Sequence, residues 1–186
     1  MSIARYLDEQ GEPIPYGHRW GAQPPPEKMY SVVRHPQRFV PVVDLARTLI
    51  DYLSEHYQVN IIRDEEIALE PVAGAALRFQ LEEGGEVTGV RIEAGLLAEE
   101  LFPTCSCDAC DDDVPQLLDD LEDFVFAVVQ GDFAEWREGR WIHHGIYLGD
   151  TLTRSSGHKI TDRGQWARVK PRAKELPGRY PAWPRR

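Results

Sequence analysis

The chain has 186 residues and a formal net charge of −10. Its content of 42% hydrophobic and 28% charged residues is that of a globular protein and excludes disorder along the whole chain. A chain of this length buries on the order of 70% of its unfolded surface, so it needs neither disulfides nor a metal to fold. Because no run of about 18 apolar residues occurs, we expect no membrane-spanning segment.

We expect a single domain over residues 1–186, divided into three parts. Residues 1–30 read as an irregular arm, because prolines and glycines recur too often for a long helix or a central strand. Residues 31–157 form the body of the domain. Residues 158–186 form a basic, Pro-rich C-terminal segment, in which Trp166 and Trp183 are the expected anchors.

Two segments, roughly 41–56 and 114–130, carry apolar side chains at three- and four-residue spacing, which predicts amphipathic helices. Alternation of apolar and polar residues predicts strands at 58–63, 75–82, 87–93 and 141–148, with a hairpin turn at Gly84-Gly85. The leucines of 96–102 suggest a short helix. We therefore predict an α+β fold: a mostly antiparallel sheet, two main amphipathic helices packed on one face, and irregular Pro-rich arms at both ends.

All three cysteines of the chain lie within six positions, at Cys105, Cys107 and Cys110. Such close spacing lets thiolates converge on one ion, and Zn²⁺, with Zn–S distances of ~2.3 Å, is the usual one. A tetrahedral site needs a fourth ligand. His144 is the candidate we select because it shares a strand face with Ile142 and Ile146, although a lone histidine there is more often a hydrogen-bonded core residue. The other candidates are Asp108, Asp111, His143 and His158.

Two further interpretations of the cysteines stay open. Cys107-Asp108-Ala109-Cys110 is a Cys-x-x-Cys close to a helix N-terminus, a position that lowers a thiol pKa. Against a redox role, the sequence lacks a thioredoxin-like strand–helix context, and the neighbouring carboxylates raise the pKa of a thiol. In the third interpretation the cysteines are small, partly buried thiols, either free or joined as a Cys107–Cys110 disulfide.

The distribution of charge bears on the partners. Residues 159–186 hold nine Lys or Arg and two acids, a net charge of about +7, so the rest of the chain carries about −17. A basic tail can bind nucleic acid. We expect it instead to fold back onto its own acidic domain, because a strongly acidic body repels phosphate. The sequence therefore disfavours nucleic acid and a membrane as partners, and leaves open both an unknown protein partner and the oligomeric state.

Catalytic signatures are otherwise absent from the sequence: there is no phosphate-binding loop, dinucleotide fingerprint, nucleophile elbow or zinc-protease motif. The N-terminus lacks the basic and apolar blocks of a signal peptide, and an odd number of clustered cysteines argues against a secreted disulfide framework. We expect a cytoplasmic protein.

The segment Phe102-Pro103-Thr104-Cys105-Ser106-Cys107-Asp108-Ala109-Cys110-Asp111, followed by an acidic amphipathic helix, resembles a family of uncharacterised actinobacterial proteins, a domain of unknown function. The shared pattern is Phe-Pro-x-Cys-x-Cys-Asp-x-Cys-Asp. The resemblance implies no activity, substrate or partner. The resemblance is consistent with a bacterial origin. The use of more Arg than Lys in the chain is consistent with it as well.

The sequence supports two hypotheses from different classes. In the first, the protein is a non-enzymatic binding or interaction module whose cysteine loop is structural, with Zn²⁺ as the candidate ion and no other cofactor. In the second, it is a thiol- or metal-dependent enzyme that uses Cys105, Cys107 and Cys110. A fully coordinated metal favours the first hypothesis, and an exposed thiol of low pKa beside a pocket favours the second.

Overall fold

The computed structural model describes residues 5–85 and 87–186. These residues form three α-helices and two antiparallel sheets, which confirms the predicted α+β class. The chain folds into two compact units. Unit 1 contains the residues up to Leu49, Leu81–Arg91 and Leu101–Glu122, and unit 2 contains Ile50–Gln80, Ile92–Glu100 and Asp123–Arg186. The single domain expected from the sequence stays a prediction.

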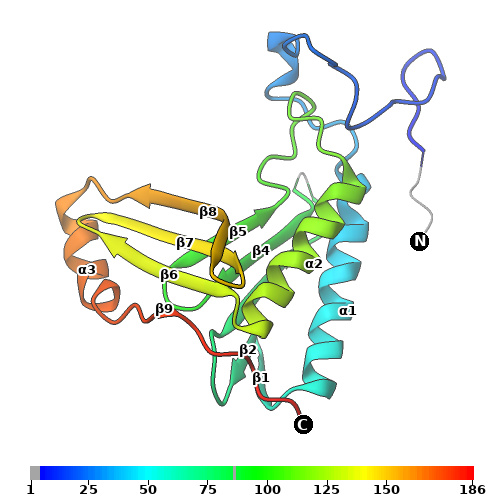
Figure 1. Cartoon of the computed structure of the whole chain (residues 1–186). Helices are drawn as coiled ribbons and strands as arrows, with labels where there is room; N and C mark the ends of the chain where they lie inside the picture. The colour runs from blue at the N-terminus through cyan, green and yellow to red at the C-terminus, as the bar shows by residue number, and fades with distance from the viewer. Residues whose placement is uncertain (1–4, 86) are drawn as a thin grey trace. The chain divides into compact units, whose positions relative to one another are not determined.

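The first sheet is a meander, in which the strands lie side by side in the order of the sequence (Figure 1). Alternate residues are buried, for example Leu77 and Phe79 on one strand and Val90 and Ile92 on the next. The strands that hold these two pairs, Leu77–Glu82 and Gly89–Ala94, are neighbours in the sheet, which confirms the hairpin predicted from the alternation. The strands are β1 (Val59–Arg63), β2 (Ile67–Pro71), β3 (Leu77–Glu82), β4 (Gly89–Ala94) and β5 (Ala98–Phe102).

The last strand, β5, corrects the short helix expected from the leucines before the cysteines. Gly95 turns the chain with a φ of +64°, and the following N–H groups of Leu96, Leu97 and Ala98 donate to the carboxylate of Glu135 at 2.7–2.8 Å. Glu135 is fully buried, and its carboxylate also accepts a hydrogen bond from the Tyr180 hydroxyl at 2.5 Å. This carboxylate holds the turn that sends the chain back beside β4, so the leucine spacing reflects a turn and a strand.

The second sheet has the order β8-β7-β6-β9. One of its faces is buried through residues such as Phe133 and Ile142. On the other face the rings of Trp136, His143 and Trp141 stack, with centroids 5.3 Å and 5.8 Å apart. The strand predicted at 141–148 is confirmed in full. The strands are β6 (Phe133–Glu138), β7 (Trp141–Leu148), β8 (Thr151–Lys159) and β9 (Gly178–Arg179).

Both predicted helices are present, as α1 (Val40–His56) and α2 (Val114–Gln130). Their apolar stripes are buried, which is the outcome that the three- and four-residue spacing requires. The packing of both helices on one sheet face stays a prediction. Among the described residues, no helix is long and apolar enough to cross a membrane.

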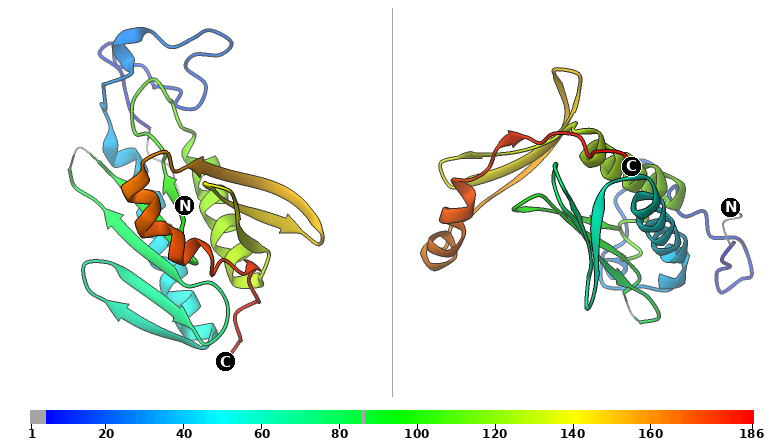
Figure 2. Two further views of the ribbon diagram at one scale, coloured as in Figure 1. Left: turned by 90° about the vertical axis from the view of Figure 1, so that its left-hand side faces the viewer. Right: turned by 90° about the horizontal axis from the view of Figure 1, so that it is seen from below.

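The C-terminal segment is more regular than the sequence suggested. It forms α3 (Arg163–Ala173), whose N-cap Asp162 accepts a hydrogen bond from the backbone N–H of Gln165 at 2.7 Å. Residues of α3 such as Trp166 pack against a buried cluster that contains Ile142 of β7. Figures 1 and 2 show the helix beside the second sheet. With only a few apolar residues among many charges, α3 has too weak a stripe to stand out in the sequence. Trp183 is an anchor as predicted, because it is buried and its Nε1 donates to the Ala75 carbonyl at 2.9 Å.

Candidate metal centre

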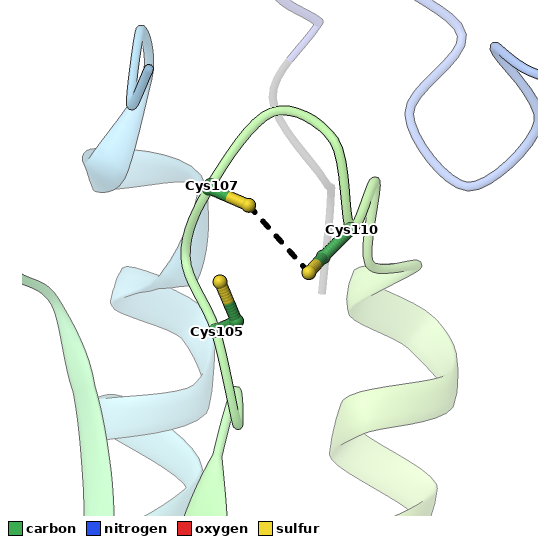
Figure 3. A group of neighbouring side chains, drawn as sticks. All are labelled: Cys105, Cys107 and Cys110. Carbon is green, nitrogen blue, oxygen red and sulfur yellow. Dashed lines mark hydrogen bonds between the residues drawn. The ribbon is translucent and has the colours of Figure 1, made fainter. Parts of the chain in front are cut away.

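The three cysteines lie in the loop of unit 1 that joins β5 to α2. Their Sγ atoms all lie within 4.8 Å of one another, and no other group of three or more metal-binding side chains this close occurs in the described part of the chain. Figure 3 shows the three sulfurs turned toward one shared space. The Sγ atoms of Cys107 and Cys110 are 3.5 Å apart, and all three thiols are free of disulfides.

Two backbone features fold this loop. The N–H of Cys110 donates to the carbonyl of Cys107 at 3.2 Å, which closes a tight turn and brings the two side chains to the same side. Asp111 then takes a left-handed φ of 53°, which redirects the chain toward α2. Aspartate is one of the few residues other than glycine that tolerate this conformation, so the residue after Cys110 suits its position.

The three sulfurs have different environments. Cys107 is buried, whereas Cys105 and Cys110 are exposed. Burial raises the pKa of Cys107, but hydrogen bonds from Cys105 and Cys110 and from the backbone N–H groups of Cys110 and Ala109 outweigh it, so its pKa is lowered. Burial, together with the hydrogen bonds and charge of the other two cysteines, raises the pKa of Cys110 to about 12. The loop therefore stabilises a thiolate at Cys107 more than one at Cys110.

The two acidic candidates for a fourth ligand form ion pairs instead. Asp108 is fully buried, and one guanidinium nitrogen of each of Arg19, Arg34 and Arg38 lies 3.6 Å from its carboxylate. Asp111 accepts hydrogen bonds from the backbone N–H of Arg19 at 2.8 Å and from the Arg19 side chain. These carboxylates balance the charge of Arg19, Arg34 and Arg38 and are not part of the sulfur cluster.

The same interactions join the cysteine loop to the N-terminal arm of unit 1. The N–H of Asp108 donates to the carbonyl of Val32 at 2.7 Å, and that of Ala109 donates to the carbonyl of Met29 at 3.1 Å. The guanidinium of Arg38, 3.9 Å from the centroid of the Tyr16 ring, completes this contact by stacking. The sequence did not reveal this arginine cluster, because its members lie at least 70 residues from Asp108.

The candidate histidines belong to unit 2. His144 Nε2 lies 2.7 Å from Glu100 Oε1. His143 lies between the rings of Trp136 and Trp141, and His158 is exposed on β8. The structure therefore brings together Cys105, Cys107 and Cys110, while the role of His144 as fourth ligand stays a prediction.

A cavity of about 320 Å³ in unit 1 is lined in part by Cys105. Its wall also contains polar side chains, among them Thr88, Thr104 and Ser106. Gly89 also lines the cavity, and a Cβ atom there would come 2.6 Å from the carbonyl oxygen of Phe102, so glycine lets β4 approach the start of the loop. The exposed Cys105 of the sulfur cluster thus borders this cavity.

Comparison with known proteins identifies the family. Residues 2–186 match a family of unknown function, DUF6226, and the chain belongs to this family. The membership in a family of unknown function expected from the cysteine segment is confirmed, while the actinobacterial origin and the shared motif stay predictions. No curated protein and no solved structure matches the chain.

Proposed function

For this member of DUF6226, we propose a role as a non-enzymatic binding module in which Cys105, Cys107 and Cys110 hold a structural Zn²⁺ ion. The observation that carries the proposal is the convergence of three sulfurs within 4.8 Å in a loop whose backbone also donates hydrogen bonds to the Cys107 sulfur. Soft thiolates select zinc over magnesium or calcium. The ion would tie the loop between β5 and α2 into one rigid turn.

The geometry is close to that of a zinc–thiolate site. Two sulfurs bound to tetrahedral zinc at ~2.3 Å are about 3.8 Å apart. The Cys107–Cys110 separation of 3.5 Å is close to this distance, so binding requires only a small outward movement of side chains. Hydrogen bonds from backbone N–H groups to a bound sulfur stabilise the thiolate and orient it, as outer-sphere contacts do in known metal sites.

Elemental analysis of protein purified without a chelator or a histidine tag tests this proposal. We expect one zinc per chain, and we expect Cys107→Ser to lose the ion and to lower the melting temperature. Ser106→Ala is the matched control, because it changes the neighbouring residue and leaves all three sulfurs in place. Metal-free protein in which all three thiols react freely would contradict the proposal.

The fourth coordination position is tested separately. His144 Nε2 contacts the carboxylate of Glu100. Metal-binding histidines are commonly oriented by such a carboxylate on their second ring nitrogen, so His144 is the residue to test. If His144 is the ligand, His144→Ala lowers zinc affinity as strongly as a cysteine substitution does. Unchanged zinc content in His144→Ala would assign the position to another ligand or to water.

The second candidate function, a thiol-dependent enzyme, is supported by the opposite pKa shifts of Cys107 and Cys110. A reactive thiol must also be accessible. Cys107, the sulfur with the lowered pKa, is 6% exposed, which favours the metal-binding role. The rate of alkylation against pH separates the two functions: rapid reaction at Cys107 below its ordinary pKa would support the enzyme.

The proposed setting is a reducing cytoplasm, where three clustered thiols stay available for a metal. A protein partner fits this role better than a membrane or a substrate. The compartment is tested by fractionation of the source cells, and recovery from an oxidising compartment would contradict it.

A further inference from the structure

Strand β8 ends the second sheet on one side. It pairs with β7, and among the described residues no strand pairs with its other edge. All nine of its residues are exposed. Proteins commonly block such an edge with a proline or cover it with another element. The sequence of β8 contains no proline, so its backbone is open to pairing with a further strand.

The outward backbone groups of β8 can be identified. The N–H of Ile160 donates to the carbonyl of Arg140 at 3.0 Å, and Trp141 lies opposite Lys159. In an antiparallel ladder this makes Trp141 and Lys159 a non-hydrogen-bonded pair, so the N–H and C=O groups of Lys159 point away from β7. By the two-residue period of a strand, the same groups of Gly157 and Ser155 also point outward.

This edge is basic, although the chain as a whole is acidic. Strand β8 contains Arg154 and Lys159 and no acidic residue. The adjacent helix α3 adds four cations, again without an acidic residue. A peptide that paired with β8 would therefore lie beside the cations of this strand, which favours a segment rich in Asp or Glu.

One face of the edge also offers apolar surface. Trp141 and Leu152 are 43% and 40% exposed. Between them along the edge, Gly157 has no side chain, and a Cβ there would lie 2.5 Å from His143 Nδ1, so the His143 ring forms this part of the face that an added strand would meet. Side chains of a strand alternate between the two faces, so apolar residues at every second position of the partner would reach this surface.

We propose that β8 binds an extended acidic segment of a partner protein, which adds as a further strand to the sheet and alternates acidic with apolar residues. The main-chain groups of Ser155, Gly157 and Lys159 supply hydrogen bonds, and the cations of β8 and α3 supply the preference for acid. The inference rests on the binding-module part of the proposed function and is independent of the zinc ion.

Two other occupants fit the edge less well. A second copy of the chain pairing through its own β8 would place the same cations against one another, which is unfavourable. The outward carbonyl groups of β8 alternate with its outward N–H donors. These carbonyl oxygens would repel the phosphates of a nucleic acid. An acidic peptide satisfies the donors, the acceptors and the charge together.

The test uses an acetylated and amidated heptapeptide of alternating glutamate and valine, added to the full-length protein. We expect perturbed amide resonances and slowed amide exchange at Ser155, Gly157 and Lys159. The matched peptide with lysine in place of glutamate, and a glutamate–valine peptide with one N-methylated backbone amide, should each bind about tenfold more weakly, a loss of about 1.4 kcal/mol. Equal binding of the N-methylated peptide would overturn strand addition.

Variants of the protein provide the complementary test. Ser155→Pro removes one outward N–H without removing a hydrogen bond to β7, and it should weaken binding about threefold to tenfold. Ser155→Ala keeps that N–H and should bind as the parent does. Lys159→Glu should lower the affinity for the glutamate peptide and raise it for the lysine peptide; unchanged preference would overturn the charge argument.

The remaining outcomes also decide between occupants. Self-association that is lost in Ser155→Pro, or a single-stranded oligonucleotide that displaces the glutamate peptide, would assign the edge to another partner and overturn the inference. Each titration is repeated after treatment with a chelator. Peptide binding that survives in protein shown to contain no zinc supports the edge inference even where the metal proposal fails.

Discussion

Replacing Glu135 by glutamine should destabilise the protein more than any exposed carboxylate change, because this buried side chain organises the turn before β5. Its Oε1 accepts the N–H groups of Leu97 and Ala98 at 2.7 Å each. Its Oε2 accepts the N–H of Leu96 at 2.8 Å and the Tyr180 hydroxyl at 2.5 Å. Burial and hydrogen bonding to Glu135 raise the pKa of Tyr180, so the hydroxyl stays a donor at ordinary pH.

The magnitude follows from these four hydrogen bonds. A glutamine amide puts an NH₂ donor in place of one oxygen of Glu135. At the Oε2 position it leaves the Leu96 N–H without an acceptor, while Tyr180 can rotate to accept. A buried unsatisfied donor costs about 1–3 kcal/mol. The remaining hydrogen bonds are also no longer strengthened by the negative charge of the carboxylate, so we expect the free energy of unfolding to fall by about 3 kcal/mol. For a chain of this size that lowers the melting temperature by about 6–12 °C.

The assay is thermal and urea unfolding of Glu135→Gln beside Glu138→Gln. Glu138 lies in the same strand, β6, and is exposed, so it carries the same change of charge without the buried contacts. We expect the Glu138 variant to stay within about 0.5 kcal/mol of the parent. Equal melting temperatures for the two variants would refute the assignment of Glu135 as the residue that holds the turn.

Three further predictions concern other parts of the molecule. The pKa of Cys110 is raised to about 12, so zinc must displace the proton of this thiol when it binds. Zinc affinity should therefore rise with pH, and calorimetry in two buffers should show proton release. A pH-independent affinity would contradict thiolate binding. Asp108→Asn removes the carboxylate that lies 3.6 Å from the buried Arg38 guanidinium and should cost about 3 kcal/mol in chemical unfolding. A Cβ at Gly74 would lie 2.5 Å from Trp183 Cδ1, so Gly74→Ala should cost about 2 kcal/mol and expose the C-terminal segment to protease. Gly84→Ala, with positive φ but nothing within 4 Å, is its control.

Some elements could be predicted because their signal is local. The apolar spacing of 114–130 produced a helix with the bounds Val114–Gln130, and the alternation of 141–148 produced β7. The cysteines converge for a related reason, since a spacing of one and two residues leaves a short loop few ways to separate them. Where the pattern was weak, as in α3, or ambiguous, as in the leucines of 96–102, the local signal failed.

The sequence alone determined the α+β class, the two long helices, the main hairpin and the grouping of three thiols, because each depends on residues within about one helical turn or one strand of each other. The tertiary structure decided which sulfur is buried, that the Asp108 carboxylate pairs with arginines, and that Glu135 turns the chain into β5. These outcomes join residues tens of positions apart. A buried carboxylate is stable only where folding brings donors to it, and no local pattern records which donors those are.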